Sequence, residues 1–137
     1  MSQKALFERL GAPLKNVRWS WGAVRAKDGA VFLRVWQDET LRRGTSTFMR
    51  LTSNNEHFQT TNPTDLGYQE RQKHVAVVSA GARCYMIMCV AVDTTAEPRV
   101  VESFNSHEVW LGGDLIDVDG DTWLELKSRV GISDAQC

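Results

Sequence analysis

The sequence predicts an α+β fold, in the form of a small mixed or mostly antiparallel β-barrel or bent sheet with one central helix and a short N-terminal helix. Two Asp-Gly pairs, Asp28-Gly29 and Asp119-Gly120, each lie between runs of alternating apolar residues, which is typical of β-hairpins. Residues 84–92 form a nearly unbroken apolar run, which indicates a strand buried on both faces. The 137 residues are expected to form a single domain, 1–137.

Two segments carry helix signals. In residues 2–10, Ser2 is a suitable N-cap and Gly11 ends the helix before Pro13. Residues 66–80 follow Thr64 and Asp65, either of which can cap a helix, and Gly81 closes it. The second helix is expected to bury Tyr68, Val75 and Val78 and to turn Glu70, Arg71 and Lys73 toward water.

The remaining elements are strands and one long loop. Turn residues and period-two apolar patterns define the boundaries of the strands. The polar segment 53–65 is expected to be a loop that is mobile or functional, because it is longer than a simple connection needs to be. Strands are expected at 17–26, 31–39, 45–52, 84–92, 100–104, 109–111, 115–118 and 121–130.

Charge is distributed unevenly along the chain. The whole sequence has a formal net charge of -1, yet residues 1–50 carry ten Lys and Arg against four Asp and Glu, a net charge of +6. Residues 51–137 carry six Lys and Arg against thirteen Asp and Glu, a net charge of -7. The basic half is compatible with a face that binds phosphates, and the alternative is that the two halves pair with each other across the fold.

Three features bear on the cellular setting. Cys84, Cys89 and Cys137 lack zinc-type spacing, so we expect reduced thiols in a cytoplasmic protein. The N-terminal residues lack the apolar core and cleavage site of a signal peptide. No apolar run reaches the roughly 20 residues that cross a bilayer, so no membrane partner is expected.

The first hairpin gathers an unusual set of side chains. If Asp28-Gly29 is a two-residue loop, the numbers of paired residues sum to 57, so Trp21 opposes Trp36 and Arg25 opposes Phe32. Side chains alternate between the faces of a strand, which places the aromatic and charged residues together on one face. That face contains Trp19, Trp21, Ala23, Arg25, Phe32, Arg34, Trp36 and Asp38.

Aromatic planes beside guanidinium groups and a carboxylate can hold a nucleobase, by stacking on its ring and by hydrogen bonds to its edge. Asp38, or Glu39 if the strand ends early, would accept a hydrogen bond from the base. The alternative is a second hydrophobic core against a helix, from which the aliphatic stems of the arginines extend outward to solvent. The candidate ligand-binding residues are Trp19, Trp21, Trp36, Asp38, Arg25, Arg34 and Tyr68, and the candidate phosphate-binding residues are Arg18, Arg42 and Arg43.

No established catalytic or cofactor motif occurs in the sequence. The chain has no HExxH, no phosphate-binding glycine loop and no Gly-x-Ser-x-Gly. The acidic residues around Asp119 fit a turn better than an EF-hand, because glycine and glutamate stand at the wrong positions. We therefore expect no cofactor and no metal.

Two stretches carry a family resemblance. Residues 17–39, VRWSWGAVRAKDGAVFLRVWQDE, and residues 67–93, which contain GYQERQKHVAVVSAG and RCYMIMCVAVD, resemble segments of uncharacterised bacterial and phage proteins. The order of elements resembles the PUA-like superfamily, whose SRA and EVE-type members hold a modified or flipped base in an aromatic pocket. The resemblance implies a base-reading module, and no residue of those families is carried over individually.

The leading hypothesis is a module that binds a modified nucleobase in DNA or RNA and catalyses no reaction. One alternative is a small hydrolase or nuclease that uses Asp38, Glu70, His74 and Asp93. A second alternative is a protein-interaction domain, such as a phage or bacterial inhibitor, that docks through its aromatic face.

The hairpin hypothesis makes a direct prediction for Trp36. If Trp36 stacks on a base, Trp36→Ala abolishes oligonucleotide binding and leaves the fold intact. If Trp36 belongs to a second core, the same change destabilises the fold, because it removes a large buried aromatic side chain. Binding titrations together with circular dichroism and thermal melting distinguish the two outcomes.

Overall fold

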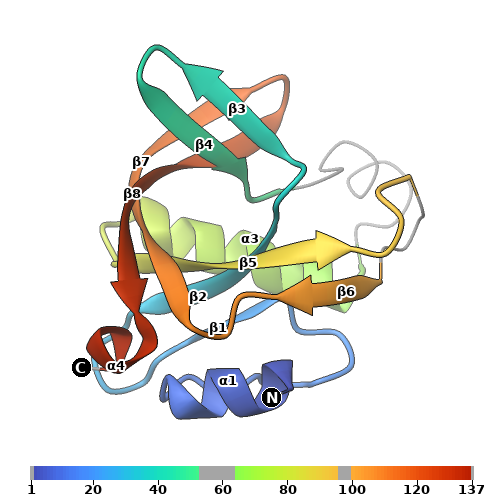
Figure 1. The fold of residues 1–137 in the computed structure, drawn as a ribbon, viewed down its shortest axis with the longest axis vertical. Coiled ribbons are helices and arrows are strands. Elements are labelled where there is room, and N and C mark those ends of the chain that lie inside the picture. The colour runs from blue at the N-terminus through green and yellow to red at the C-terminus, as the bar shows by residue number, and fades with distance from the viewer. Residues whose placement is uncertain (1, 53–63, 96–99, 137) are drawn as a thin grey trace.

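The computed structural model describes residues 2–52, 64–95 and 100–136, so most of the expected loop 53–65 lies outside the described residues. The fold is α+β, with three helices and an eight-stranded, mostly antiparallel sheet (Figure 1). The elements are α1 (Gln3–Arg9), β1 (Gly22–Val24), β2 (Val31–Trp36), β3 (Thr40–Arg43), β4 (Ser46–Arg50), α3 (Leu66–Ser79), β5 (Cys84–Ala91), β6 (Val101–Phe104), β7 (Glu108–Val118), β8 (Asp121–Gly131) and α4 (Ile132–Ala135).

The sheet is bent and does not close into a barrel. Its strand order is β1-β2-β5-β7-β8-β4-β3, with β6 paired to β5, and in the described part of the chain β1 and β3 do not pair with each other. All neighbouring strands are antiparallel except β2 and β5, which run parallel. The sequence predicts either a barrel or a bent sheet, and the structure confirms the bent sheet.

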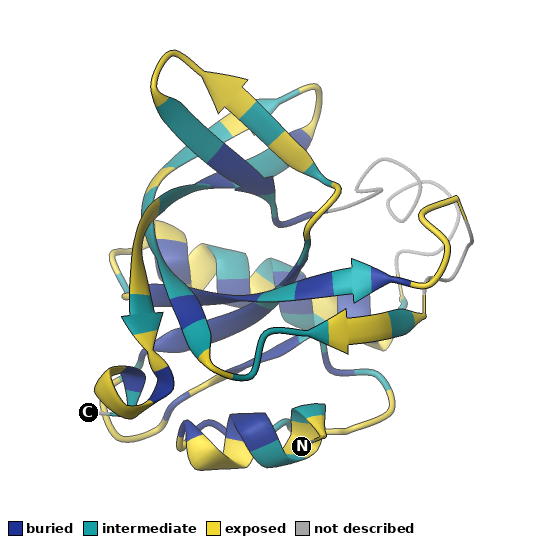
Figure 2. Ribbon diagram, viewed as in Figure 1, coloured by how far each residue is buried: buried dark blue, intermediate teal, exposed yellow. Residues whose placement is uncertain are grey.

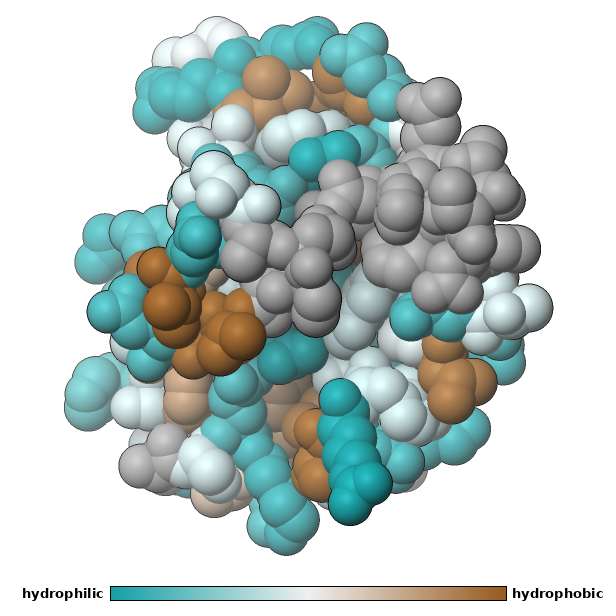
Figure 3. All heavy atoms as spheres, turned by 90° about the vertical axis from the view of Figure 1, so that its right-hand side faces the viewer, coloured by the Kyte–Doolittle hydropathy of each residue, from teal (hydrophilic) through white to brown (hydrophobic). Residues whose placement is uncertain are grey.

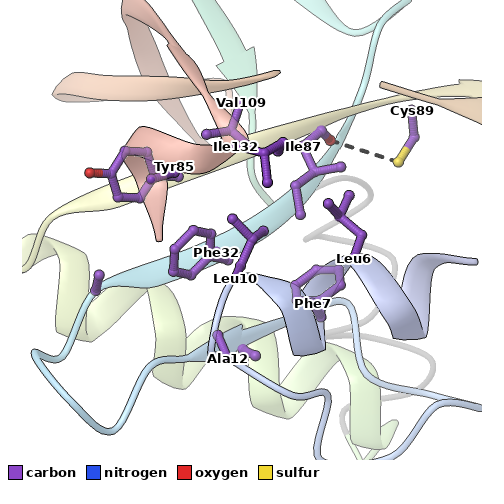
Figure 4. Packing of buried hydrophobic residues seen from close by; sticks show 13 residues of the cluster. Leu6, Phe7, Leu10, Ala12, Phe32, Tyr85, Ile87, Cys89, Val109 and Ile132 are labelled. Atoms are coloured by element: carbon purple, nitrogen blue, oxygen red, sulfur yellow. Dashed lines mark hydrogen bonds between the residues drawn. The ribbon is translucent and has the colours of Figure 1, made fainter. Parts of the chain in front are cut away.

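The two faces of the sheet pack against different helices. On one face, α1 and α4 cover Phe32, Tyr85 and Ile87, as the close view in Figure 4 shows for the labelled residues. On the other face, Val78 of α3 packs in one cluster with Leu33 and Met86. Strand β5 lies between the two cores, and Figure 2 shows the buried residues along it. The prediction that residues 84–92 form a strand buried on both faces is confirmed.

Each of the two longer helices has the ends that its sequence predicts. The Ser2 side chain accepts a hydrogen bond from Ala5 N (3.1 Å), and the Asp65 side chain accepts one from Tyr68 N (2.9 Å). Gly11 and Gly81 follow the C-caps at positive φ, +78° and +113°, which glycine adopts without strain. No described helix is long and apolar enough to cross a membrane.

The register predicted for the first hairpin is wrong by two residues. Ala23 pairs with Phe32, and the loop spans residues 26–29, because Arg25 N donates to Ala30 O (2.7 Å) and Gly29 N donates to Arg25 O (2.8 Å). Only Gly29 has a positive φ there, whereas a two-residue type I′ loop needs two such residues. A shift of two preserves the alternation, so Ala23, Phe32 and Arg34 still share one face.

The predicted strand 17–26 is also too long. Asn16 Oδ1 accepts from Arg18 N (2.9 Å), and Asn16 O accepts from Trp19 N and Ser20 N (3.3 and 2.9 Å). These bonds bend residues 16–20 into a turn, since a short polar side chain competes with the sheet for backbone donors. Trp19 therefore leaves the hairpin, and β1 begins at Gly22.

The second hairpin forms around the predicted turn, but its strands are longer and less regular than predicted. Asp119 and Gly120 both have positive φ, 51° and 84°, as a type I′ turn requires. The separate strands predicted at 109–111 and 115–118 are one strand, β7. Register shifts on either side of Gly112 mark two β-bulges. Bulges increase strand bending, and they account for the curvature that folds β8, β4 and β3 over the sheet.

Arg25 offers a test of how the helices are attached to the sheet. Its Nη1 donates to the carbonyl oxygens of Leu10 (3.0 Å) and Ala135 (2.5 Å), which end α1 and α4. We expect Arg25→Ala to lower the free energy of unfolding by about 2–4 kcal/mol, because two buried carbonyls lose their donor. Urea denaturation measures this, with exposed Arg18→Ala as the control. Equal stability of the two variants would contradict the assignment.

Candidate functional site

The structure places most of the hairpin face inside the protein. Ala23 and Phe32 are buried in the cluster beneath α1, and Arg25 is 1% exposed. The Arg25 guanidinium lies 5.0 Å from the centre of the Phe32 ring and donates two hydrogen bonds to Asp28 (2.9 and 2.8 Å). These bonds hold the pKa of the Asp28 carboxyl well below its usual range. Arg25 thus acts as an internal connection, whereas the second-core alternative expected the arginine side chains to extend outward.

Trp19, Trp21 and Tyr68 lie at the start of α3. A Cβ on Gly67 would overlap the Trp21 indole and the Trp19 carbonyl oxygen, so only glycine allows this close approach of the helix. The Arg71 guanidinium lies 5.8 Å from the Trp21 ring centre. Tyr68 is buried at 8% exposure. The Trp21 indole and the Trp19 backbone thus lie against the start of α3.

Arg34, Trp36 and Asp38 take three different environments along β2 and beyond it. Arg34 donates to Gln3 Oε1 (2.8 Å) and to Ser20 O (3.2 Å), and its burial lowers the pKa of the guanidinium. Trp36 packs at the edge of the α1 cluster. Asp38 lies in the exposed turn after β2. The predicted ligand-binding residues therefore do not line one site.

The three candidate phosphate-binding residues are exposed. Arg18 lies in the turn before β1, and Arg42 and Arg43 lie on β3. Arg42 donates to Thr47 Oγ1 on the neighbouring strand (3.3 Å). Their exposure leaves them accessible to a phosphate backbone, which remains a prediction.

The residues of the hydrolase alternative are not assembled into a metal centre. Among residues 2–52, 64–95 and 100–136, no three His, Cys, Asp or Glu side chains gather as metal ligands. Glu70 accepts from Ser20 Oγ (3.1 Å), and Asp93 accepts from Thr95 N and Oγ1 (2.9 and 2.7 Å). His74 is buried at 8% exposure.

The buried polar cluster on α3 contradicts one sequence expectation. Arg71, predicted to face water, is 3% exposed, because its guanidinium donates to carbonyl oxygens just after β4, just before β1 and within β2. Burial and the Arg71 charge lower the pKa of His74 to about 4, and burial raises the pKa of Glu70. Within the described residues, His74 Nδ1 and Glu70 Oε1 have no hydrogen-bond partner.

A cleft of about 520 Å³ lies along β5, between β6 and the β7–β8 hairpin. This volume is in the usual range for sites that bind small ligands. Met88 and Val90 of β5 supply an apolar wall, and the turn from Asn105 to His107 supplies polar groups. The lining residues are Gln37, Met88, Val90, Ser103, Phe104, Asn105, Ser106, His107, Glu108, Trp110 and Arg129.

Trp110 and Arg129 form the recognisable chemical centre of the cleft. They are direct cross-strand partners, and the Arg129 guanidinium lies 4.9 Å from the centre of the Trp110 ring. Glu108 Oε1 lies 3.6 Å from Arg129 Nη1, and the two side chains are 32% and 66% exposed. A pair this exposed contributes only about 0–1 kcal/mol, so a ligand can exchange with either partner at little cost.

The turn beside these residues has a fixed conformation. Asn105 Oδ1 accepts hydrogen bonds from His107 N (2.9 Å) and Glu108 N (3.0 Å). Asn105 N donates to Met88 O (3.0 Å), which ties the turn to β5. Glu108 is therefore held beside Trp110 by the backbone, which favours binding without rearrangement.

The cleft combines an aromatic ring, a guanidinium and a carboxylate, the chemistry that the sequence predicted for the first hairpin. The sequence signal for this site is the second Asp-Gly pair, Asp119-Gly120, which the prediction for the first hairpin does not use. The same reasoning at Asp119-Gly120 gives partner numbers that sum to 239, which pairs Trp110 with Arg129 as observed. Comparison of the chain with protein-family models, with curated proteins and with solved structures found no match.

His74 gives a pH test of the buried cluster. The unfolded chain binds a proton near pH 6.5 and the folded chain only near pH 4, so the free energy of unfolding falls as pH falls between these values. Between pH 7 and pH 5 the loss from this residue is about 1–2 kcal/mol. We expect His74→Gln to remove that part of the slope in urea denaturation at both pH values.

The comparison isolates His74 from its neighbours. Glu70 acts in the opposite sense, because its raised pKa favours the protonated carboxyl in the folded state, and it is present in both proteins. His107→Gln, at an exposed position, is the control. Parallel slopes for the wild type and His74→Gln would show that His74 is not neutral in the fold.

Proposed function

We propose that this protein is a nucleic-acid-binding module that holds an unpaired nucleobase, in DNA or RNA, in the cleft of Trp110 and Arg129. The observation that carries the proposal is the guanidinium 4.9 Å above the indole ring, within a cleft of nucleotide size. Arginine planes and aromatic rings are the surfaces on which proteins stack single-stranded bases. The base-reading chemistry expected from the sequence is retained, and its location changes from the first hairpin to the second.

The side chains around the stack match the edge of a base. Glu108 offers carboxylate oxygens that accept from an exocyclic amine, as acidic side chains do with cytosine. Asn105 Oδ1 is used within its own turn, so its amide donors are the groups that point to other acceptors. A base held between a donor and an acceptor is discriminated by its edge as well as by its ring.

The size of the cleft favours one base at a time. A duplex presents only groove edges, and a base reaches a cleft of this kind when it is single-stranded or flipped out of the stack. Met88 and Val90 provide apolar contact for the ring away from water. The proposal assigns binding alone to this site, with no chemical step.

Electrostatics fits a base-centred mode of binding. The net charge is -1, and several arginines of the basic half are engaged inside the fold. Long-range attraction to phosphates is therefore weak, and contacts with the base must provide most of the affinity. Exposed Arg42 and Arg43 are the cations we assign to the phosphate backbone.

Among residues 2–52, 64–95 and 100–136, the protein-interaction alternative finds no fully exposed aromatic anchor. On the face shown in Figure 3, the hydrophobic groups that can be seen form several small patches with hydrophilic side chains beside them. Exposed large apolar side chains in the described residues are Val17, Val24, Leu66, Val77, Val92 and Val100, with no aromatic residue among them. Hot spots of protein–protein interfaces are enriched in Trp, Tyr and Arg. These exposed valines and leucine therefore support a protein-interaction function less than the cleft supports nucleobase binding.

Fluorescence anisotropy with a labelled mixed-sequence 12-nucleotide DNA or RNA at low salt tests the proposal. We expect Arg129→Ala and Trp110→Ala each to weaken binding about 5- to 100-fold, because base stacking contributes about 1–3 kcal/mol. Trp110→Phe should retain most of the affinity, because phenylalanine keeps an aromatic face. Oligonucleotides with unmodified and modified bases then show which base is preferred.

Two controls separate the cleft from general effects. Arg9→Ala removes an exposed arginine of α1, outside the cleft, and should leave the affinity unchanged. Trp123→Ala removes an indole on β8 that also faces an arginine, Arg50 at 5.9 Å, but lies outside the cleft. Circular dichroism checks the fold of each variant. No binding by the wild type, or an equal loss in Arg9→Ala, would overturn the proposal.

A further inference from the structure

A second cavity, of about 500 Å³, lies at the other end of β5, between the C-terminal end of α3 and the bulges of β7–β8. Its apolar floor belongs to the core under α3 and includes Cys84, Leu115 and Leu124. Its rim contains two cations, Arg83 and Lys127, and one carboxylate, Asp114, all exposed. The lining is completed by Val78, Ser79, Gly81, Ala82, Gly112 and Gly113.

The bulges place the Lys127 side chain at this cavity. Leu111 pairs with Ser128 and Gly112 pairs with Leu126, so Lys127 is an extra residue in β8 with no partner across the ladder. A bulge commonly directs an extra side chain toward a site that the regular alternation would miss. The buried Leu124 side chain also favours glycine at position 112, because a Cβ there would lie 2.5 Å from Leu124 Cδ2.

The other groups at the cavity are held in place by the backbone. Arg83 O accepts from Val31 N (2.8 Å), so the Arg83 backbone is fixed beside β2 while its side chain is exposed. Glu125, behind the bulge, accepts from Ser46 Oγ (2.8 Å) and Asp114 N (3.3 Å). These bonds lower the pKa of Glu125, and so does the nearby charge of Lys127, so this carboxylate offsets part of the Lys127 charge.

The helix end next to the cavity is largely neutralised. The carbonyl oxygens of Ala76, Val77 and Val78 accept from Ala80 N, Ala82 N and Gly81 N (3.0, 3.2 and 3.0 Å). The last carbonyls of α3 are thus satisfied within the chain, which reduces the negative charge that a helix C-terminus presents. The rim itself carries two positive side chains against one negative.

We propose that this cavity is a second binding site, which takes a phosphate group between Arg83 and Lys127. Guanidinium and ammonium groups are the usual protein ligands of phosphate, and both line this cavity together with Gly81, Gly112 and Gly113. The site is independent of the nucleobase cleft, since the two share no lining residue. The phosphate comes either from a nucleotide or from a nucleic-acid backbone.

The test is a titration of the whole chain with inorganic phosphate, followed by amide NMR and compared with chloride at equal ionic strength. We expect saturable shifts at Gly81, Gly112, Gly113 and Asp114 with phosphate alone. Arg83→Ala and Lys127→Ala should each weaken binding about tenfold, since a hydrogen bond to a charged group is lost. Asp114→Asn should strengthen binding, because it removes a repulsive charge, and Lys127→Arg should preserve it.

The controls make each outcome decisive. Arg9→Ala, which removes an exposed arginine outside both cavities, should leave phosphate affinity unchanged. Shifts that appear equally with chloride, or that persist in Arg83→Ala and Lys127→Ala, overturn the site. Because inorganic phosphate has no base, failure here leaves the oligonucleotide result intact, and loss of oligonucleotide binding leaves this result intact. A 5′-mononucleotide and an unphosphorylated 12-mer then distinguish the two phosphate sources.

Discussion

The fold depends on the buried guanidinium of Arg71. Its two terminal nitrogens donate to the carbonyl oxygens of Leu51 (2.7 Å), Trp21 (3.1 Å) and Arg34 (2.8 Å). These carbonyls lie after β4, before β1 and within β2, so one side chain of α3 ties the helix to three strands. Burial lowers its pKa to about 10, and the residue therefore stays charged at neutral pH. Without this donor, the Leu51 and Arg34 carbonyls would each lose a buried hydrogen bond, whereas Trp21 O would keep the one from Arg34 N (3.0 Å).

Arg25 has a comparable role on the opposite side of the sheet, where it binds the last carbonyls of α1 and α4. Arg50 pairs with Glu39 (2.8 Å) and with Asp121, and so links the basic and acidic halves of the chain. The positive charge of residues 1–50 is consequently used in part to hold the fold together. Two aromatic side chains of this region also pack beside buried arginines: Phe32 lies next to Arg25, and Trp21 lies next to Arg71.

Local patterns in the sequence predicted the elements well, and the failures have identifiable causes. Helix ends at Ser2, Gly11, Asp65 and Gly81 were predictable, because caps act over one turn. The pairing at Asp28-Gly29 was not, because the same dipeptide fits a two-residue and a four-residue loop. Arg71 was assigned to water because its partners are backbone carbonyls, which leave no trace in a residue pattern.

The sequence predicted the kinds of side chain in the candidate site, but it assigned them to the first hairpin instead of the second. Pairing arithmetic extended to Asp119-Gly120 would have found Trp110 opposite Arg129. This pairing is correct only because β7 and β8 each contain one extra residue, so the two shifts in register cancel. The sequence pattern does not show these two bulges, except that Gly112 and Gly113 are a visible sign of the irregularity.

This cancellation constrains how the chain can change in evolution. The segments from Trp110 to Val118 and from Asp121 to Arg129 are equal in length only because each contains one bulge. A single insertion or deletion in one segment must be absorbed by its bulge or matched in the other segment. Otherwise a neighbouring residue, such as Ser128, would replace Arg129 opposite the indole. Related proteins that preserve the cleft should therefore vary in length here by compensated pairs of residues.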